Sequence, residues 1–326
     1  MALKGIDYLR KKLASKRNRI ETRYRYYEMK HLAQDLGIST PPQAKWMAYA
    51  MGWCAKAVDS LADRLLFREF ANDIYNMNDV FEQNQKDIFV DSAILGALIS
   101  SCDFIFITTD EDGFPRFKVI DGSHATGIID PVTNMLKEGY AVLEWNEYDK
   151  PIMEAYLVPG TTQIYQHGEL VEQIDTGMDY PLLVPIINRP DAVRPFGHSR
   201  ISRACMSHVS AAVRTAKRSE VASEFYSFPQ RYILGMENSA ERMDKWKVTM
   251  STLLRIDKDS DGDHPVVGQF NQQSMTPHIE QLRMFAGLFA GETGLTLDDL
   301  GFATDNPSSA DAIRAGHENL RLLARK

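Results

Sequence analysis

A run of short strand-like segments between residues 104 and 173 most constrains the fold of this chain. Phe104–Thr109 is β-branched and aromatic, Asp112-Gly113 marks a turn, and Arg116–Ile120 is expected to return as a second strand. Further strands are expected at Thr126–Ile129, Ala141–Trp145, Met153–Val158, Gln163–Tyr165 and Glu169–Gln173. Because these segments follow one another across tight turns, they predict an antiparallel meander and exclude the alternating strand–helix order of a nucleotide-binding domain.

Helical patterns flank this β region on both sides, so the sequence predicts an α+β fold. Apolar spacing predicts helices from Ile6 to about Leu36, capped by Gly37, and from Gln43 to about Phe70 after Pro41-Pro42. A shorter helix is expected from Asp87 to Ser100. After the strands, four prolines space out an extended connector: Pro181, Pro185, Pro190 and Pro195.

The C-terminal part begins with a long helix that Ser199 is expected to cap and that runs to about Tyr226. A strand at Phe228–Gly235, a short helix at Ala240–Met250 and a strand at Leu253–Ile256 are expected next. Thr276-Pro277 starts a helix that reaches about Gly291. Ser308-Ser309-Ala310-Asp311 is expected to form a capping box for a last helix that continues to Lys326.

The helix after Ser199 has an unusual composition, because small residues occupy several of its faces. They include Ser202, Ala204, Ser207, Ser210, Ala211, Ala212, Ala216, Ser219, Ala222 and Ser223. Few bulky apolar residues are present to hold it in a single core. The composition favours close packing against copies of the same helix.

Composition indicates a folded protein of about two domains, since the chain has 326 residues, 44% apolar and 25% charged. The formal net charge of −7 argues against tight binding of DNA over the whole surface. The three cysteines, Cys54, Cys102 and Cys205, are widely spaced and indicate neither disulfides nor zinc. Neither a signal peptide nor an apolar run of membrane-spanning length is found.

The first predicted helix carries a basic cluster with tyrosines after it. The basic residues are Lys11, Lys12, Lys16, Arg17, Arg19, Arg23 and Arg25. Two interpretations stay open at this point: a surface that contacts DNA, or the solvated face of an ordinary helix.

Signatures of catalysis are missing from the sequence, which has no phosphate-binding loop, no nucleophile elbow and no HExxH helix. The segment Asp257–Asp263 matches the start of a calcium-binding loop, but the position of the bidentate glutamate is Gly268. An acidic β-turn and a cation site both stay open for it. The sequence therefore predicts no enzyme, and neither a metal nor a cofactor is expected.

Four stretches of the chain share a pattern with one known family. They are Gly287–Leu295 through Leu300-Gly301 and Asn306–Ile313, Phe196–Ile201, Phe228–Gly235, and the tyrosine-rich N-terminal helix with the long helix after it. Together these stretches resemble the portal proteins of tailed bacteriophages and prophages. The likeness spans nearly the whole chain and preserves the order of the family's segments. Relatives usually continue into a crown after the last helix, and we expect the crown to be absent from this sequence.

The resemblance implies a portal fold, with an α/β wing, long stem helices, a small α/β clip and a tunnel loop. Carried onto this chain, it places the wing at 1–198, the first stem helix at 199–227, the clip at 228–274, the second stem helix at 275–294, the tunnel loop at 295–307 and the start of the following wing helix at 308–326.

The resemblance also assigns candidate functional residues. In the tunnel loop, the residues expected to face DNA are Asp298, Asp299, Asp305 and Asn306. In the first stem helix, the residues expected at the subunit interface are Ser202, Ala204, Ser207, Ala211, Arg214 and Arg218. In the clip, the residues expected to face the terminase or an adaptor are Arg231, Tyr232, Trp246 and Arg255.

The implied function is that of a head–tail connector ring, typically dodecameric, at one capsid vertex, through which double-stranded DNA is packaged and ejected. The implied partners are further copies of the chain, the DNA, the terminase large subunit, capsid and scaffold proteins, and a head-completion adaptor, with no membrane. The expected location is the virion, after synthesis in the bacterial cytoplasm. Two alternatives stay open: a metal-dependent DNA-processing enzyme using Asp257–Asp263, and a DNA-binding adaptor using Lys11–Arg25.

Overall fold

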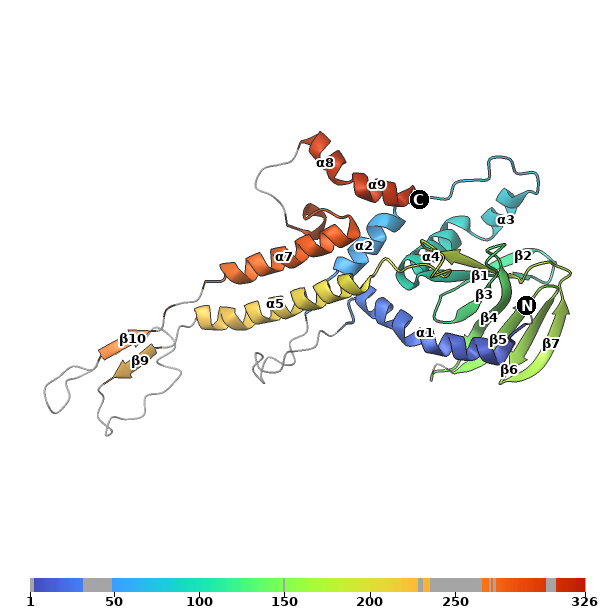
Figure 1. Ribbon diagram of the computed structural model, residues 1–326, viewed down its shortest axis with the longest axis horizontal. Coiled ribbons are helices and arrows are strands. Elements are labelled where there is room, and N and C mark those ends of the chain that lie inside the picture. The colour runs from blue at the N-terminus through green and yellow to red at the C-terminus, as the bar shows by residue number, and fades with distance from the viewer. Residues whose placement is uncertain are drawn as a thin grey trace. The chain divides into compact units, whose positions relative to one another are not determined.

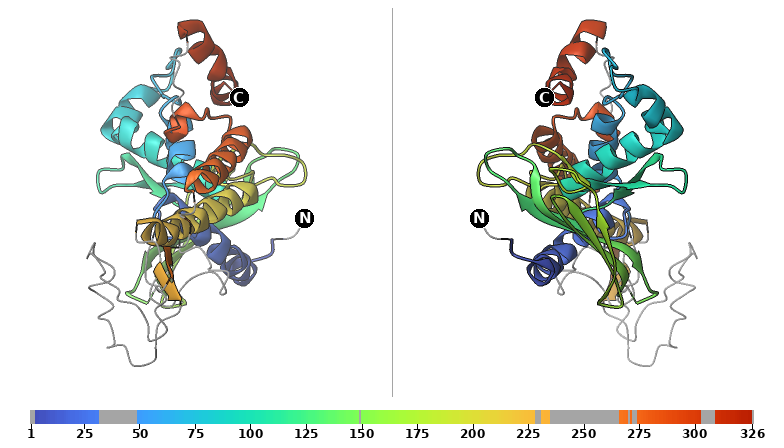
Figure 2. Two further views of the ribbon diagram at one scale, coloured as in Figure 1. Left: turned by 90° about the vertical axis from the view of Figure 1, so that its left-hand side faces the viewer. Right: turned by 90° about the vertical axis from the view of Figure 1, so that its right-hand side faces the viewer.

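The computed structural model describes residues 3–31, 49–148, 150–227, 231–234, 266–269, 271, 274–302 and 309–325. The chain divides into two compact units, one formed by residues 1–31, 50–209 and 286–326, and the other by residues 32–49 and 210–285. Helices and strands are both well represented, so the predicted α+β class is confirmed (Figure 1 and Figure 2). The division into wing, stem, clip and tunnel loop stays a prediction.

The predicted meander forms a five-stranded antiparallel sheet in the first unit, in the order β3-β4-β5-β6-β7. Its strands are β3 (Ala125–Ile129), β4 (Leu136–Trp145), β5 (Pro151–Val158), β6 (Thr161–Gln166) and β7 (Glu169–Asp175). Each of the five matches a predicted strand. The order leaves β3 and β7 as the two edges of the sheet.

A second sheet of three strands has the order β2-β1-β8 and is also antiparallel. It contains β1 (Cys102–Thr109), β2 (Pro115–Ile120) and β8 (Leu183–Ile187). The prediction of a single meander followed by an extended connector is therefore wrong in two respects. The first two strands belong to a separate sheet, and part of the connector is a strand. Pro185 is tolerated there because β8 lies at an edge, where a missing amide donor is not needed on the open side.

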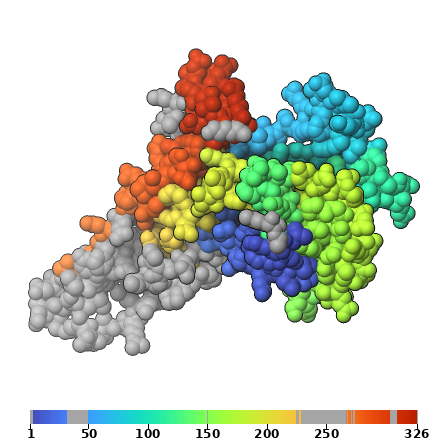
Figure 3. All heavy atoms as spheres, turned by 45° about the vertical axis from the view of Figure 1, so that its right-hand side comes forward, coloured from blue at the N-terminus to red at the C-terminus, as the bar shows by residue number. Residues whose placement is uncertain are grey.

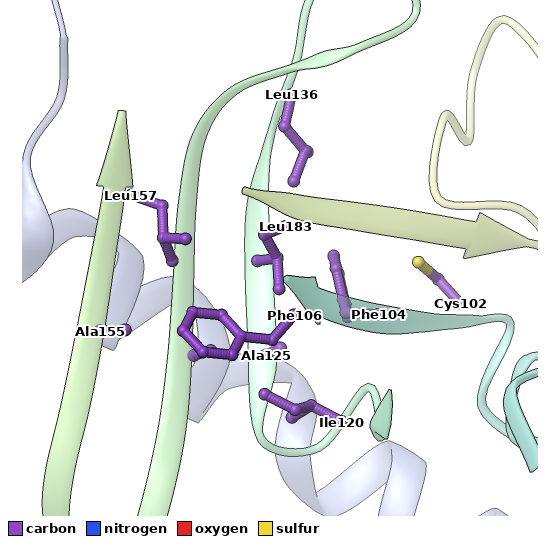
Figure 4. Close-up of a cluster of buried hydrophobic side chains, with 10 residues drawn as sticks. Cys102, Phe104, Phe106, Ile120, Ala125, Leu136, Ala155, Leu157 and Leu183 are labelled. Carbon is purple, nitrogen blue, oxygen red and sulfur yellow. The ribbon is translucent and has the colours of Figure 1, made fainter. Parts of the chain in front are cut away.

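The main core lies between these two sheets (Figure 4). Phe104, Phe106 and Leu183 of the smaller sheet meet Ala155 and Leu157 of the larger one. The alternation of a strand explains this, because successive side chains point to opposite faces. Ala141 thus faces this core, while its neighbours Tyr140 and Val142 face helix α1.

Helix α1 (Ile6–Tyr27) covers the other face of the five-stranded sheet (Figure 1 and Figure 3). Leu9 and Leu13 pack against Tyr140, Val142 and Tyr156. The predicted stripe of apolar residues is therefore confirmed.

Two buried carboxylates fix α1 to the sheet. Glu138 accepts hydrogen bonds from the backbone amides of Lys4 and Gly5, at 2.8 and 2.9 Å, just before the helix begins. Glu154 accepts two bonds from the Arg10 guanidinium, at 3.1 Å from Nε and 2.6 Å from Nη2. These bonds satisfy amides that a helix start leaves open and pair a carboxylate that burial would otherwise destabilise.

Helix α1 ends well before Leu36, so the predicted end of this helix is wrong. The predicted cap, Gly37, lies outside the described residues. Met29 adopts a positive φ of 59°, and the Lys30 amide donates back to the Arg25 carbonyl at 2.8 Å. This is the backbone pattern that usually closes a helix at glycine, made here by a methionine. The ring of His31 stacks on Tyr26, with centroids 3.8 Å apart, and covers that end.

The second predicted helix is shorter than expected, because α2 covers only Trp53–Ala62. The predicted start at Gln43 lies outside the described residues, but residues 49–52 and 65–70 are not helical. Phe67 and Phe70 instead turn away to meet Phe81, with ring centroids 5.2 and 5.0 Å apart. Phe81 lies on α3 (Met77–Gln83), a helix that was not predicted, whereas the predicted α4 (Lys86–Ser100) is confirmed.

The long helix α5 spans Arg203–Ser227, and its predicted cap at Ser199 is wrong. Ser202 is the cap, since its Oγ accepts from the Cys205 amide at 3.1 Å. Ser199 instead donates its hydroxyl to the Ile99 carbonyl at 2.6 Å. Because this bond holds the chain against the end of α4, the helix starts later.

The predicted strand after α5 is confirmed as β9 (Arg231–Leu234), which pairs with β10 (Val266–Gln269). The predicted elements at 240–250 and 253–256 lie outside the described residues. Helix α7 (Thr276–Thr293) confirms the start predicted at Thr276. A turn of 3-10 helix, η2, follows at Asp298–Leu300.

The last predicted helix is divided in two, α8 (Ala310–Gly316) and α9 (Glu318–Ala324), so the single helix is wrong. The capping residue also differs from the prediction. Ser309 accepts from the Ala312 amide at 3.2 Å, one residue later than the predicted box. The break falls at His317, whose ring nitrogen lies 3.7 Å from the Asp299 carboxylate.

All three cysteines are free and buried. Among the described residues, no helix combines the length and the apolar character that crossing a membrane requires.

Candidate assembly surfaces and a basic cavity

Helix α5 is less dependent on other copies than its composition suggests. Cys205, Val209, Ala212 and Val213 are buried within the single chain. In the second unit, Thr215 donates its hydroxyl to the Gln281 side chain on α7 at 3.1 Å. One stripe of the helix is therefore covered by the chain itself, and only the remaining faces are open to a neighbour.

The six predicted interface residues divide by exposure. Ser207 is exposed, whereas the other five are half-buried: Ser202, Ala204, Ala211, Arg214 and Arg218. Ser202 caps the helix and also donates to Glu292 at 2.8 Å, so its hydroxyl already has a local use. The structure brings these residues onto one helix, but whether they meet another subunit stays a prediction.

The turn after α7 separates the predicted tunnel residues. Asp299 is held locally, because its Oδ2 accepts from both the amide and the hydroxyl of Thr296 at 2.9 Å. The Asp299 amide in turn donates to Thr296 Oγ1 at 3.2 Å, which completes a capping box that sequence reasoning missed. Asp298 is exposed. The predicted residues Asp305 and Asn306 lie outside the described residues.

The predicted clip residues are only partly placed. Arg231 and Tyr232 lie on β9, opposite Gln269 and Gly268 of β10. Trp246 and Arg255 lie outside the described residues, as does the acidic segment Asp257–Asp263. The choice between an acidic turn and a cation site therefore stays open.

The basic residues of α1 take a place that neither interpretation foresaw. Several of them line a cavity of about 910 Å³ in the first unit, between α1, strand β3 and the segment 193–206. Lys12 and Lys16 lie over the ring of Phe196, at 4.6 and 4.8 Å from its centroid. Lys12 also donates to the Gly127 carbonyl at 2.5 Å, and Arg23 to the Ser100 carbonyl at 2.5 Å.

The electrostatics of the cavity are unfavourable to its own cations. Burial, with repulsion from Lys16 and Lys4, lowers the pKa of Lys12 to about 8. Burial and Arg19 likewise lower the pKa of Lys16. Burial, with repulsion from Arg19 and Arg194, lowers the pKa of Arg23 to about 10. The buried Nε of Arg23 has no hydrogen-bond partner.

The spacing of these cations was a signal that the sequence contained. Lys12, Lys16, Arg19 and Arg23 recur at helical intervals, which places them along one side of a helix. The opposite wall, at residues 193–203, is far away in the chain, so the cavity itself was not predictable from the spacing.

Comparison with curated proteins confirms the predicted resemblance to phage portal proteins. The chain is 23% identical over 318 residues to the portal protein of Mycobacterium phage L5, and 24% identical over 318 residues to that of Mycobacterium phage D29. Each alignment covers 90% of this chain and 65% of the phage protein. The chain thus spans a little less than two thirds of the length of these curated relatives.

No family model matches the chain. Among solved structures, it is similar to a chain of the neck of the native gene transfer agent particle with C12 symmetry, at a TM-score of 0.49 and 14% identity. A chain of the native particle's virion gives a TM-score of 0.47 and 13% identity. Both alignments cover 83% of this chain and 73% of the other.

Proposed function

We propose that this chain is a portal subunit, which forms a ring-shaped channel for double-stranded DNA at a capsid vertex of a phage-like particle. The observation that carries the proposal is the alignment with two curated portal proteins along 90% of the chain. The role is structural and involves no catalysis. The finished protein resides in the virion, after synthesis in the host cytoplasm.

In this proposal the exposed faces of α5 contact neighbouring subunits. Among the six residues predicted at this interface, Ser207 is the best placed, because it is exposed and the other five are half-buried. Asp298 supplies negative charge beside the channel, where it repels phosphate and keeps DNA from sticking. Asp299 contributes less to that field, since its carboxylate is engaged by Thr296.

The segment around β9 and β10 is proposed as the clip. Arg231 and Tyr232 lie on its described strand and would face the terminase large subunit during packaging and a head-completion adaptor afterwards. Capsid and scaffold proteins are the proposed partners of the first unit.

The proposal is tested by the mass and shape of the purified chain. Light scattering is expected to give about twelve times the 36.9 kDa of one chain, and negative-stain microscopy a ring with a central hole. Particles of one or two chains at all concentrations would contradict it. Introducing a negative charge at the exposed α5 position, by Ser207→Glu, is expected to reduce ring formation. Glu147→Lys, which changes the charge of an exposed turn, serves as the control.

The cavity argues against the DNA-binding adaptor. Lys12, Lys16 and Arg23 are directed into a space bounded by Phe196 and β3, not onto an open surface that a duplex can lie along. Phosphate contacts to a duplex need cations that reach its outer backbone.

A further inference from the structure

The cavity beside α1 holds a concentration of positive charge with nothing of the opposite sign. Among the described residues that line it there are seven lysines and arginines and no aspartate or glutamate. The whole chain, by contrast, has a net charge of −7. Of these seven, Lys12, Lys16 and Arg23 are half-buried and the other four are exposed. Charges that lose part of their water need compensation, so this arrangement indicates an anionic ligand.

The cations are spaced for a ligand with more than one negative group. Lys12, Lys16, Arg19 and Arg23 lie within twelve residues of α1, and the first and last are roughly 16 Å apart at the rise of an α-helix. Arg23 Nε is buried and without a hydrogen-bond partner, and the Lys16 ammonium group lies over the Phe196 ring, 4.8 Å from its centroid. A single small anion would leave most of this row uncompensated.

The lining favours a protein ligand over a nucleic acid. Single-stranded nucleic acids are held by aromatic rings on which bases stack, together with backbone cations. The ring of Phe196 is already covered by the ammonium groups of Lys12 and Lys16. The remaining lining includes apolar side chains such as Ile128, Ile129 and Met206, which suit a segment that contains both acidic and apolar residues.

The chain itself carries such a segment at the opposite edge of the same sheet. Strand β7 is exposed along its whole length, with the acidic residues Glu169, Glu172 and Asp175. Its apolar residues are also open, with 50% of Leu170, 63% of Val171 and 43% of Ile174 exposed. Because the sheet order is β3-β4-β5-β6-β7, β7 forms the edge opposite β3 (Figure 1). Residues of β3 line the cavity, so the cavity adjoins the other edge.

We propose that the basic cavity of one copy binds the acidic edge strand β7 of a second copy, so that neighbouring chains join head to tail. Two different, complementary surfaces on opposite edges of one unit generate a heterologous contact, which closes into a ring if the rotation is suitable. The inference rests on the proposed ring and adds a second contact between neighbouring chains to the one proposed for α5. Ion pairs at the mouth of the cavity replace solvent around Lys16 and Arg19, while the apolar residues of β7 lose water.

Charge reversal on each side tests the contact. One variant combines Lys16→Glu with Arg19→Glu, a second combines Glu169→Lys with Glu172→Lys, and a third carries all four changes. Lys11→Glu, exposed on α1 outside the cavity lining, and Glu147→Lys, exposed on the β4–β5 turn, are the matched controls. Circular dichroism establishes that every variant is folded, and sedimentation velocity measures assembly at fixed ionic strength.

Each two-residue reversal is expected to weaken self-association at least tenfold, and the four-residue variant to recover most of the loss, with both controls near wild type. Reversals that leave assembly unchanged, or a four-residue variant no better than the others, would overturn the inference. A cavity reversal that spares assembly but abolishes binding of a labelled single-stranded oligonucleotide would overturn it in favour of nucleic acid.

The outcome also separates this inference from the proposed function. A wild-type ring that the reversals do not affect contradicts only the contact proposed here. If the wild type forms no ring, the portal proposal loses support, and the same variants are compared for pairwise association at high concentration and low salt. Loss on reversal and recovery in the four-residue variant then support the contact, and an absence of self-association overturns it.

Discussion

Replacing Asp103 with asparagine is expected to stabilise the protein at neutral pH and to remove a pH dependence. Asp103 is the second residue of β1 and only 2% of it is exposed. Its Oδ1 accepts from Ser100 Oγ and from the Gly122 amide, each at 3.0 Å. Burial, with a contribution from the charge of Asp121, raises its pKa from 3.8 to about 8.

The sign follows from where the proton is held. Between pH 4 and pH 8 the folded protein keeps a proton on Asp103 that the unfolded chain releases, so stability falls as pH rises through this range. The stabilisation is complete below the unfolded pKa and is lost by the folded pKa. Each pH unit between these two pKa values costs about 1.4 kcal/mol, so from pH 5 to pH 8 the loss is on the order of 4 kcal/mol.

The assay is guanidinium unfolding of wild type and Asp103→Asn at several pH values. The amide retains an oxygen for the Ser100 and Gly122 donors but does not titrate, so the difference between the two proteins should grow steadily from pH 5 to pH 8. Asp112→Asn, on the exposed turn between β1 and β2, is the control and should show no such trend. A constant difference across the range would refute the assignment of a neutral Asp103.

Two further substitutions probe the elements that position the cavity and α1. Gly197→Ala should lower Tm strongly, because φ is +69° and an added Cβ would lie 2.1 Å from the Asn188 carbonyl oxygen. The control Gly113→Ala, at φ +79° with open space around it, should cost only about 1–2 kcal/mol of stability. Equal losses of stability in the two variants would contradict the steric argument. Glu154→Gln should cost about 1–3 kcal/mol by denaturant unfolding, since the Arg10 guanidinium loses its buried charged partner and keeps only the exposed Asp7. An unchanged midpoint would show that the Arg10–Glu154 pair does not hold α1.

The strands could be predicted because turn residues and β-branched runs are local features of the sequence. Which strands pair in one sheet could not be predicted. Residues 125–175 show turn residues between β-branched runs, and all five strands of the larger sheet were expected there. The separation of β1 and β2 into another sheet depends on β8, which pairs Leu183 with Phe106 across more than seventy residues. Such pairing leaves no mark within either segment.

The predictions of two helix ends were wrong for a related reason. The sequence offers Gly37 and Ser199 as natural caps, yet the chain uses Met29 and Ser202 instead. In both cases tertiary contacts decide the boundary: the His31 ring covers one helix end, and the bond from Ser199 to the Ile99 carbonyl delays the other helix. Local propensity is a weak guide where a cap residue has a better partner elsewhere.

For the candidate functional residues too, the contacts that each side chain makes could not be predicted from the sequence. Adjacent aspartates at 298 and 299 looked equivalent in the sequence, but the Thr296 side chain engages only Asp299. The basic face of α1 looked like a solvated or DNA-binding surface, because its other wall at Phe196 comes from a segment distant in sequence. The sequence therefore identified charged candidate residues, but it did not identify the group that each of them contacts.

A cavity that lowers the pKa of its own cations weakens the fold, which makes its stability a test of its purpose. Lys16→Met retains an unbranched side chain against Phe196 and removes the charge that burial and Arg19 disfavour. It is therefore expected to stabilise the single chain by about 0.5–2 kcal/mol, as substitutions that relieve a functional strain commonly do. Lys11→Met, on an exposed position of the same helix, should stay within about 0.5 kcal/mol of wild type. If the cavity binds an acidic segment, the more stable Lys16→Met protein must assemble less well, because a cation at its mouth is gone. A variant that is less stable than the Lys11→Met control would mean that Lys16 serves the fold, and the charge would then need no ligand to explain it.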